Sequence, residues 1–234
     1  MKIIYSAIVG SRGYGVAEES SDTDIMGVGI EPIEDILGLR NFEQTITSDD
    51  TGQQTIYGLK KYLRLAIRGN PTINELLWAP TLVREDPYTA MLEGIKRELL
   101  SRRTLKSYFH YMDDQIARLK GERGQKNVNR IDLVEKFGYD TKYAYHIVRL
   151  GLMGQTIGQT GRIYMPVDDF HKEILIAIRR GEWSLEKVLE TAERGKQGIE
   201  HWIHHSVLPE RPDEGKIEEV LIAIYRRAYG LVHC

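Results

Sequence analysis

The sequence has one cysteine, Cys234, among its 234 residues. Disulfide bonds within the chain are therefore excluded, and the scarcity of cysteine favours a reducing, cytoplasmic setting. A cysteine nucleophile is also disfavoured, because a thiol at the end of a chain is hard to hold in one position. The chemistry of the protein must therefore come from other residue types.

Long apolar runs are absent as well. No stretch approaches the roughly 20 apolar residues that a membrane-spanning helix requires, so we expect no membrane partner. Hydrophobic residues make up 41% and charged residues 28% of the sequence, as in globular domains. The length suits one large domain or two small ones.

The chain also lacks an excess of one charge, because 32 Lys and Arg face 34 Asp and Glu for a net charge of −2. A uniformly basic surface that attracts nucleic acid is therefore excluded, and only local groups of cations matter. Each local group fits either a solvated helix face or the wall of a groove for a polyphosphate or an RNA end. The three groups are Lys60, Lys61, Arg64 and Arg68; Arg102, Arg103 and Lys106; and Arg118, Lys120, Arg123, Lys126 and Arg130.

The pattern of apolar residues changes along the chain. β-Branched runs near the N-terminus predict strands over residues 3–9, 24–30, 42–47 and 55–56, with a short helix or turn over 14–19. Apolar residues at helical spacing then predict helices over residues 57–68, 72–78, 88–100, 101–120, 140–153, 168–180, 185–206 and 217–229.

This pattern predicts an α+β protein. We expect a mixed sheet with helices over residues 1–85 and a mostly helical region over residues 86–234, with the boundary near Pro80 to Pro87. A cleft between two such parts is the natural place for a ligand.

The most informative motif is the glycine-rich run from Gly10 to Gly15, which is followed by Asp22 and Asp24. A glycine turn after a strand exposes backbone N–H groups that bind phosphate. Alternate residues of an extended chain point to the same side, so the two carboxylates should project together. Hard oxygen ligands beside a phosphate-binding turn suit a nucleoside triphosphate held through Mg²⁺ or Mn²⁺. The alternative is a glycine turn followed by a solvated acidic loop.

Nucleotidyl transfer needs metal ions that bridge phosphate oxygens in a fixed geometry. We expect Asp22 and Asp24 to be the metal ligands. Ser11 and the N–H groups from Gly10 onward would bind the triphosphate, and Arg12 would neutralise charge on the leaving group.

Together these residues resemble the signature of the DNA polymerase beta-like nucleotidyltransferase superfamily. Three further segments resemble a bacterial and phage branch of that superfamily whose members are associated with RNA ligases and RNA repair. These segments are Tyr57–Tyr62, Gly69–Leu77 and Gly138–Leu150. The resemblance implies a palm-like mixed sheet, metal dependence and use of an NTP. It leaves the acceptor open, although an RNA end is favoured.

The resemblance also implies a third acidic residue on a neighbouring strand. The expected place, just before the helix that begins near Tyr57, holds Gln53 and Gln54 instead. Asp50, with Asp49 beside it, is the candidate substitute, and Glu43 is a weaker one. If none of them serves, the protein would bind nucleotide but turn over slowly.

A second cluster lies on the predicted helix over residues 140–153. Lys142, Tyr145, His146 and Arg149 share one helix face by their spacing. In one interpretation this face contacts the nucleotide, with Lys142 on phosphate and His146 or Arg149 near the base or the acceptor. Lys61 is a further candidate for a phosphate contact. In the other interpretation the helix is amphipathic, and its Tyr and His pack inward.

Three other functions remain open at this point. A protein hydroxyl on a partner could be the acceptor, as in toxin–antitoxin nucleotidyltransferases. The protein could also bind nucleotide or RNA without efficient catalysis, which is the function that Gln53 and Gln54 favour. Finally, it could be an interaction protein with no ligand.

Overall fold

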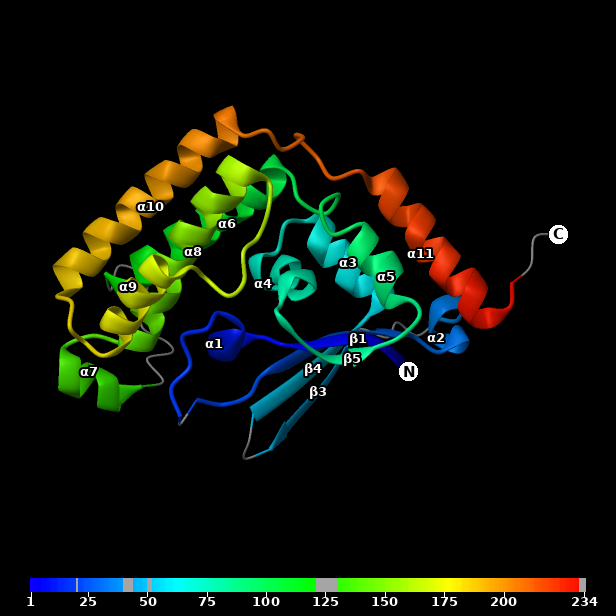
Figure 1. Cartoon of the computed structure of the whole chain (residues 1–234), viewed down its shortest axis with the longest axis horizontal. Coiled ribbons are helices and arrows are strands. Elements are labelled where there is room, and N and C mark those ends of the chain that lie inside the picture. The colour runs from blue at the N-terminus through cyan, green and yellow to red at the C-terminus, as the bar shows by residue number, and fades with distance from the viewer. Residues whose placement is uncertain (20, 40–43, 50–51, 121–129, 232–234) are drawn as a thin grey trace. The chain divides into compact units, whose positions relative to one another are not determined.

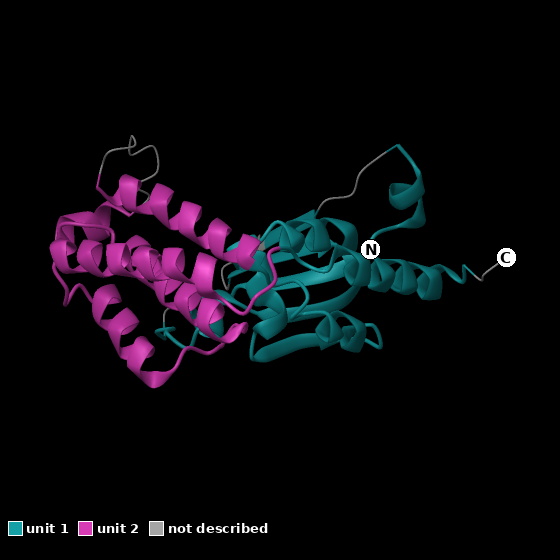
Figure 2. Cartoon of the chain, turned by 90° about the horizontal axis from the view of Figure 1, so that it is seen from above, with its two compact units in different colours: residues 1–101, 211–234 teal, residues 102–210 magenta. Residues whose placement is uncertain are grey.

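The computed structural model describes residues 1–19, 21–39, 44–49, 52–120 and 130–231. It confirms the α+β class, with a mixed sheet near the N-terminus and helices over most of the remaining chain (Figure 1). The chain divides into two compact units, which Figure 2 shows in different colours. Unit 1 comprises Met1–Ser101 and Arg211–Cys234, and unit 2 comprises Arg102–Glu210.

The sheet of unit 1 has the strand order β3-β4-β2-β1-β5. Its strands are β1 (Lys2–Ile8), β2 (Ile25–Ile30), β3 (Gln44–Asp49), β4 (Gly52–Gly58) and β5 (Thr81–Glu85). β2 and β4 are parallel, whereas every other neighbouring pair is antiparallel. The sheet is therefore mixed, as expected, and β2 lies at its centre between β1 and β4.

One strand and two helices lie where no element was expected, and the short helix or turn expected over residues 14–19 begins earlier, as the helical turn α1 (Gly10–Gly13). Every residue of β5 is exposed, and this edge strand pairs only with β1. β5 therefore has no buried apolar face. A strand is predicted from the alternation of apolar and polar residues that such a face produces, and β5 lacks this pattern. The unexpected helices, α2 (Ile33–Leu37) and α7 (Ile131–Phe137), are short and contain no buried residue.

Helices of unit 1 cover one face of the sheet and share a core with it (Figure 1). They are α3 (Leu59–Ile67), α4 (Pro71–Glu75), the 3₁₀ helix η1 (Leu76–Trp78), α5 (Thr89–Gly94) and α11 (Glu214–Tyr229). α3 ends at Ile67, and Gly69, two residues later, has a φ of +80°. Asn70 then caps α4 by accepting a hydrogen bond from the N–H of Ile73 at 3.1 Å. A left-handed glycine followed by an Asn cap and a proline is a strong signal for a helix end and a new start.

The boundary between the units differs from the expected one at residues 85 and 86. Leu92 and Leu99 lie in the same core as Val28 of the central strand, and so do Ile217 and Ile224 of α11. α5, the turns that follow it as far as Leu99, and α11 complete the cover of the sheet and belong to unit 1. Helical periodicity shows that a face is apolar, but it does not show which core that face joins.

Glu31, which follows β2, ties α11 to the sheet. Its side chain is only 3% exposed. It accepts hydrogen bonds from the N–H of Lys60 at 3.0 Å and from the hydroxyl of Tyr225 at 2.7 Å. The first bond caps α3, because the N-cap residue Gly58 has no side chain. Burial, followed by the interaction with Glu31, raises the pKa of Tyr225 above its ordinary value.

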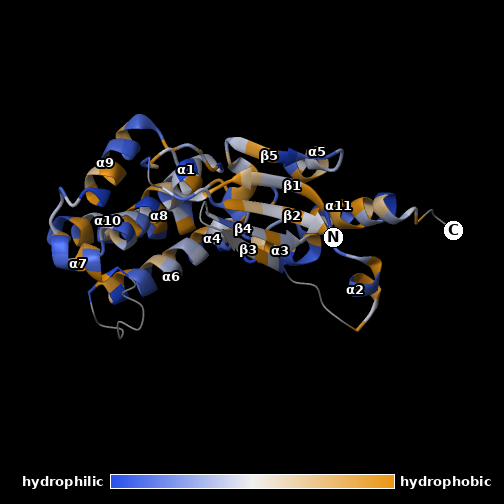
Figure 3. Ribbon diagram, turned by 90° about the horizontal axis from the view of Figure 1, so that it is seen from below, coloured by the Kyte–Doolittle hydropathy of each residue, from blue (hydrophilic) through white to orange (hydrophobic). Residues whose placement is uncertain are grey.

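Unit 2 is built around the long helix α8 (Thr141–Thr160). This helix contacts α6 (Arg102–Leu119), α9 (Asp169–Arg179) and α10 (Leu185–His205). α9 and α10 each carry polar and apolar residues along their length (Figure 3), and their buried residues recur at helical spacing. Side-chain caps begin several of these helices, including the expected Ser184, which accepts from the N–H of Lys187 at 3.2 Å.

Glycines allow α8 and α10 to pack closely. A Cβ atom on Gly195 would lie 3.0 Å from the Cα of Gly151, so the two backbones nearly touch there. Gly158 faces Trp202 with no space for a side chain. α8 continues to Thr160, beyond the expected end at residue 153, and Gly158 lies in this additional part. Across the described residues, no helix is both long and apolar enough to cross a membrane.

Candidate active site

The glycine turn follows β1 directly. The N–H of Val9 donates to the carbonyl of Asp24 at 2.9 Å, which brings the segment before β2 against the start of the turn. Gly10 has a φ of +64°, and a Cβ atom there would lie 2.7 Å from Oδ2 of Asp24. A side chain at this position is thus opposed both by backbone strain and by the aspartate. The carboxylate of Asp24 therefore lies against the turn at Gly10.

The turn leaves backbone donors available. α1 (Gly10–Gly13) is a single turn of helix, in which the N–H of Gly13 bonds the carbonyl of Val9. The N–H groups of Gly10, Ser11 and Arg12 form no hydrogen bond with any residue that the structure describes. Free N–H groups at the start of a helical turn attract anions such as phosphate.

Asp22 and Asp24 lie in the segment that leads from the glycine turn to β2. Asp22 is exposed and Asp24 is half-buried. Neither carboxylate forms a hydrogen bond or ion pair with a described residue. Unpaired carboxylate oxygens are the ligands that Mg²⁺ prefers. Within the described residues no group of three or more His, Cys, Asp or Glu converges as a metal site.

Arg12 holds the loop that leads to the two aspartates. Its Nη2 donates to the carbonyl of Ser21 at 2.7 Å, and Oγ of Ser21 accepts from the N–H of Glu18 at 2.9 Å. Arg12 itself is exposed. Its guanidinium has further donors that this bond does not use, so the expected contact with a leaving phosphate stays a prediction.

The neighbouring strand β4 carries amides where an acid was expected. β2 and β4 run parallel, with Ile25 opposite Gln54. Continuing this register back by one residue puts Gln53 beside Asp24. Gly52 packs directly on the carbonyl of Thr23, between the two aspartates. The start of β4 therefore adjoins the acidic pair. Glu43 and Asp50 lie outside the described residues.

One contact that the sequence did not predict supports the turn. The hydroxyl of Tyr14 donates to the carboxylate of Glu75, and both side chains are buried. α1 is thereby anchored to α4. The only signal for this contact was that Glu75 lies in one of the segments that resemble the RNA-repair branch.

Residues 1–222 match the family described as RlaP, the RNA repair pathway DNA polymerase beta family. The chain belongs to this family. A likeness also exists to the crystal structure of a nucleotidyltransferase-like protein from Exiguobacterium sibiricum 255-15, with 14% sequence identity over 97% of this chain and 74% of that chain. The TM-score of 0.32 is too low to support a functional comparison. No curated protein sequence matches the chain.

Of the remaining candidate residues, Lys61 lies in unit 1. It occupies the first turn of α3 and is half-buried. A phosphate contact by Lys61 in this member of the RNA-repair family stays a prediction.

Lys142, His146 and Arg149 lie on α8, as expected, but in different environments. Lys142 is exposed, whereas Arg149 is only 1% exposed. Nη1 of Arg149 lies 2.9 Å from Sδ of Met153, and Nη2 lies 3.3 Å from Nδ1 of His146. Tyr145 is buried, with the guanidinium of Arg179 over its ring. This face of α8 is therefore partly an inward-packed surface, which is what the amphipathic interpretation predicts.

The environment of His146 determines its charge. Burial, followed by the positive charge of Arg149, lowers the pKa of His146 to about 3. The imidazole is consequently neutral at physiological pH. It can donate or accept a hydrogen bond there, but it does not attract phosphate as a cation.

Proposed function

We propose that this protein is a metal-dependent nucleotidyltransferase that moves an NMP group from an NTP to a hydroxyl acceptor and releases pyrophosphate. The observation that carries the proposal is the position of Asp24 against Gly10. It brings a carboxylate, the kind of group that binds Mg²⁺, to a turn whose first N–H groups form no hydrogen bond with a described residue. Membership of a polymerase beta family supports the same reaction class.

The residues present fit a divalent cation. Asp22 and Asp24 offer hard oxygen atoms, and neither carboxylate forms an ion pair with a described Lys, Arg or His. Mg²⁺ or Mn²⁺ would supply charge stabilisation for the reacting α-phosphate and the leaving pyrophosphate. The backbone N–H groups from Gly10 to Arg12 would bind the β- and γ-phosphates. The acceptor oxygen forms its bond to the α-phosphorus as the bond to the β-phosphate oxygen breaks, and its proton passes to a carboxylate or to water.

The acceptor that we favour is an RNA end. The family is described as part of an RNA repair pathway, and the local groups of Lys and Arg offer contacts for a polyanion. A protein hydroxyl is the alternative acceptor. The same metal-assisted chemistry serves either hydroxyl, so the geometry of the site does not distinguish an RNA acceptor from a protein acceptor. Identification of the labelled product does.

A direct test supplies each of the four α-³²P-labelled NTPs with Mg²⁺ or Mn²⁺ to the full chain, in the presence of total RNA or a protein lysate. We expect label to enter RNA with one or two of the NTPs and to be absent with the Asp22→Asn/Asp24→Asn double variant. Label in protein would favour the alternative acceptor. Tight NTP binding without any labelled product would contradict transfer and favour a nucleotide-binding protein.

The third acid can be located with two substitutions. If Asp50 is the proton acceptor, Asp50→Asn should lower kcat by on the order of 10²-fold, the usual contribution of a general base, with little change in NTP affinity. If no acid serves, Asp50→Asn should have no effect. Gln53→Glu should then raise kcat, because Gln53 adjoins Asp24 in the register of β2 and β4. Initial rates across a pH series measure both variants.

A further inference from the structure

Unit 2 contains a cavity of about 310 Å³ between α8 and the segment that leads into α9. Its walls are mainly apolar and come from Leu152, Met153, Ile163, Pro166 and Val167. The deepest of these side chains are Met153 and Ile163, which are 5% and 3% exposed. The volume lies within the range of pockets that hold small organic ligands. None of the residues considered for nucleotidyl transfer lines it.

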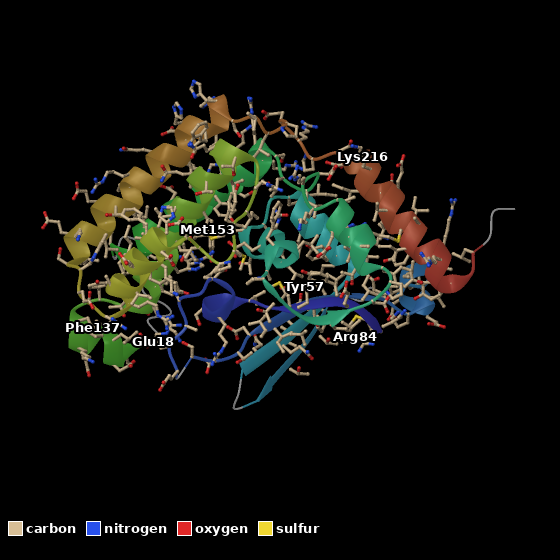
Figure 4. The ribbon with its side chains drawn as sticks, viewed as in Figure 1. Glu18, Tyr57, Arg84, Phe137, Met153 and Lys216 are labelled. Atoms are coloured by element: carbon tan, nitrogen blue, oxygen red, sulfur yellow. The ribbon has the colours of Figure 1, made fainter. Side chains whose placement is uncertain are left out.

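The rim of the cavity carries an aromatic ring that reaches solvent. Tyr164 lines the cavity and is 48% exposed. Met153, whose label in Figure 4 marks this part of α8, lines the same cavity with a polarizable thioether. Thioether and aromatic groups both bind flat rings well. The apolar part of the cavity therefore suits a planar ring.

The polar end of the cavity offers hydrogen-bond acceptors. Asp168 caps α9 by accepting from the N–H of His171 at 3.0 Å, and its Oδ2 lies 2.6 Å from Nδ1 of His171. These bonds to His171 lower the pKa of Asp168, so the carboxylate is ionised at neutral pH. It can therefore only accept, and Nδ1 must carry the proton.

We propose that this cavity binds a single unstacked nucleobase, with its ring against Met153 and Tyr164 and its amino or imino N–H groups directed at Asp168. A base combines flat apolar faces with N–H donors on its edge, as the walls and the acceptors require. The ionised Asp168 disfavours a phosphate or carboxylate group at the polar end. The base could come from a free nucleotide or from single-stranded RNA.

The test uses the full chain in EDTA, so that its result does not depend on the proposed transfer reaction. The probes are 2-aminopurine riboside and a single-stranded RNA octamer that contains one 2-aminopurine. We expect saturable quenching of the 2-aminopurine fluorescence. Tyr164→Ala should weaken binding about tenfold, in line with the loss of one base–aromatic stack. Asp168→Asn should weaken it severalfold, because asparagine keeps the helix cap but loses the charge.

Phe170→Ala is the matched control. Phe170 is an aromatic residue on α9 that is 69% exposed and does not line the cavity, so its loss should leave binding unchanged. Quenching of both probes would identify a nucleotide site, and quenching of the octamer alone would identify an RNA site; either result supports the proposal. Absence of quenching, or affinities that Tyr164→Ala and Asp168→Asn leave at the wild-type value, would overturn it. Melting curves show that both variants are folded.

Discussion

Asp24→Asn should reduce nucleotidyl transfer by on the order of 10³-fold, the scale of losing one preorganised electrostatic contact at the reacting phosphoryl group. Asparagine has nearly the same shape as aspartate, so the contact with Gly10 should survive. The substitution removes one negative charge from the proposed metal site. Asp22→Asn should cause a loss of similar size. The measurement is kcat at saturating NTP, with Mg²⁺ and Mn²⁺ varied.

The control for these variants is Glu18→Gln. Glu18, which is labelled in Figure 4, is exposed and lies in the loop between α1 and β2. This substitution removes the same charge from the same loop, while the N–H of residue 18 keeps its bond to Ser21. It should leave kcat within about twofold of wild type, because exposed charges are strongly screened. Equal losses in Glu18→Gln and Asp24→Asn would show that the loop charge, rather than a metal ligand, supports the reaction.

Gly158→Ala should destabilise unit 2 by about 2–3 kcal/mol through overpacking. A Cβ atom there would overlap Cβ of Trp202, which is attached directly to the backbone of α10 and cannot rotate away. The helices would have to separate, although alanine by itself favours a helix by about 1 kcal/mol. Urea unfolding, followed by tryptophan fluorescence in a Trp78→Phe background, reports unit 2 alone, because the remaining tryptophans, Trp183 and Trp202, belong to it.

Gly198→Ala provides the matched comparison in α10. A Cβ atom there would meet the far end of the Gln155 side chain, which can move aside. Stability should therefore stay constant or rise by up to about 1 kcal/mol. A similar loss of stability in both variants would mean that the helix–helix distance at Gly158 does not limit the packing of unit 2.

Local signals in the sequence were sufficient for most of the fold. The strands at residues 3–9 and 24–30 and the helix near residues 57–68 are present within one or two residues, because their apolar periodicity coincides with burial. β5 could not be predicted in this way, since an exposed edge strand is specified by its partner β1 rather than by its own pattern. The assignment of α5 and α11 to the sheet has the same origin, because both depend on contacts distant in sequence.

The candidate site shows a similar division. The spacing of Gly10 and Asp24 predicted two groups that the structure brings into contact. The link between Tyr14 and Glu75 could not be predicted, because a buried carboxylate paired with a tyrosine has no periodic signature. On α8, spacing alone predicted a shared face for Lys142, His146 and Arg149. It carried no information on burial, which separates the exposed Lys142 from Arg149.

The bond between Glu31 and Tyr225 has a consequence for how the protein is made. Unit 1 is discontinuous, because unit 2 is inserted between its first 101 residues and the segment that begins at Arg211. During translation the ribosome therefore releases all of unit 2 before α11 can reach the sheet. Domains fold as units while the chain emerges. The inserted helices can consequently acquire their structure first, whereas the domain that was started earliest is finished last.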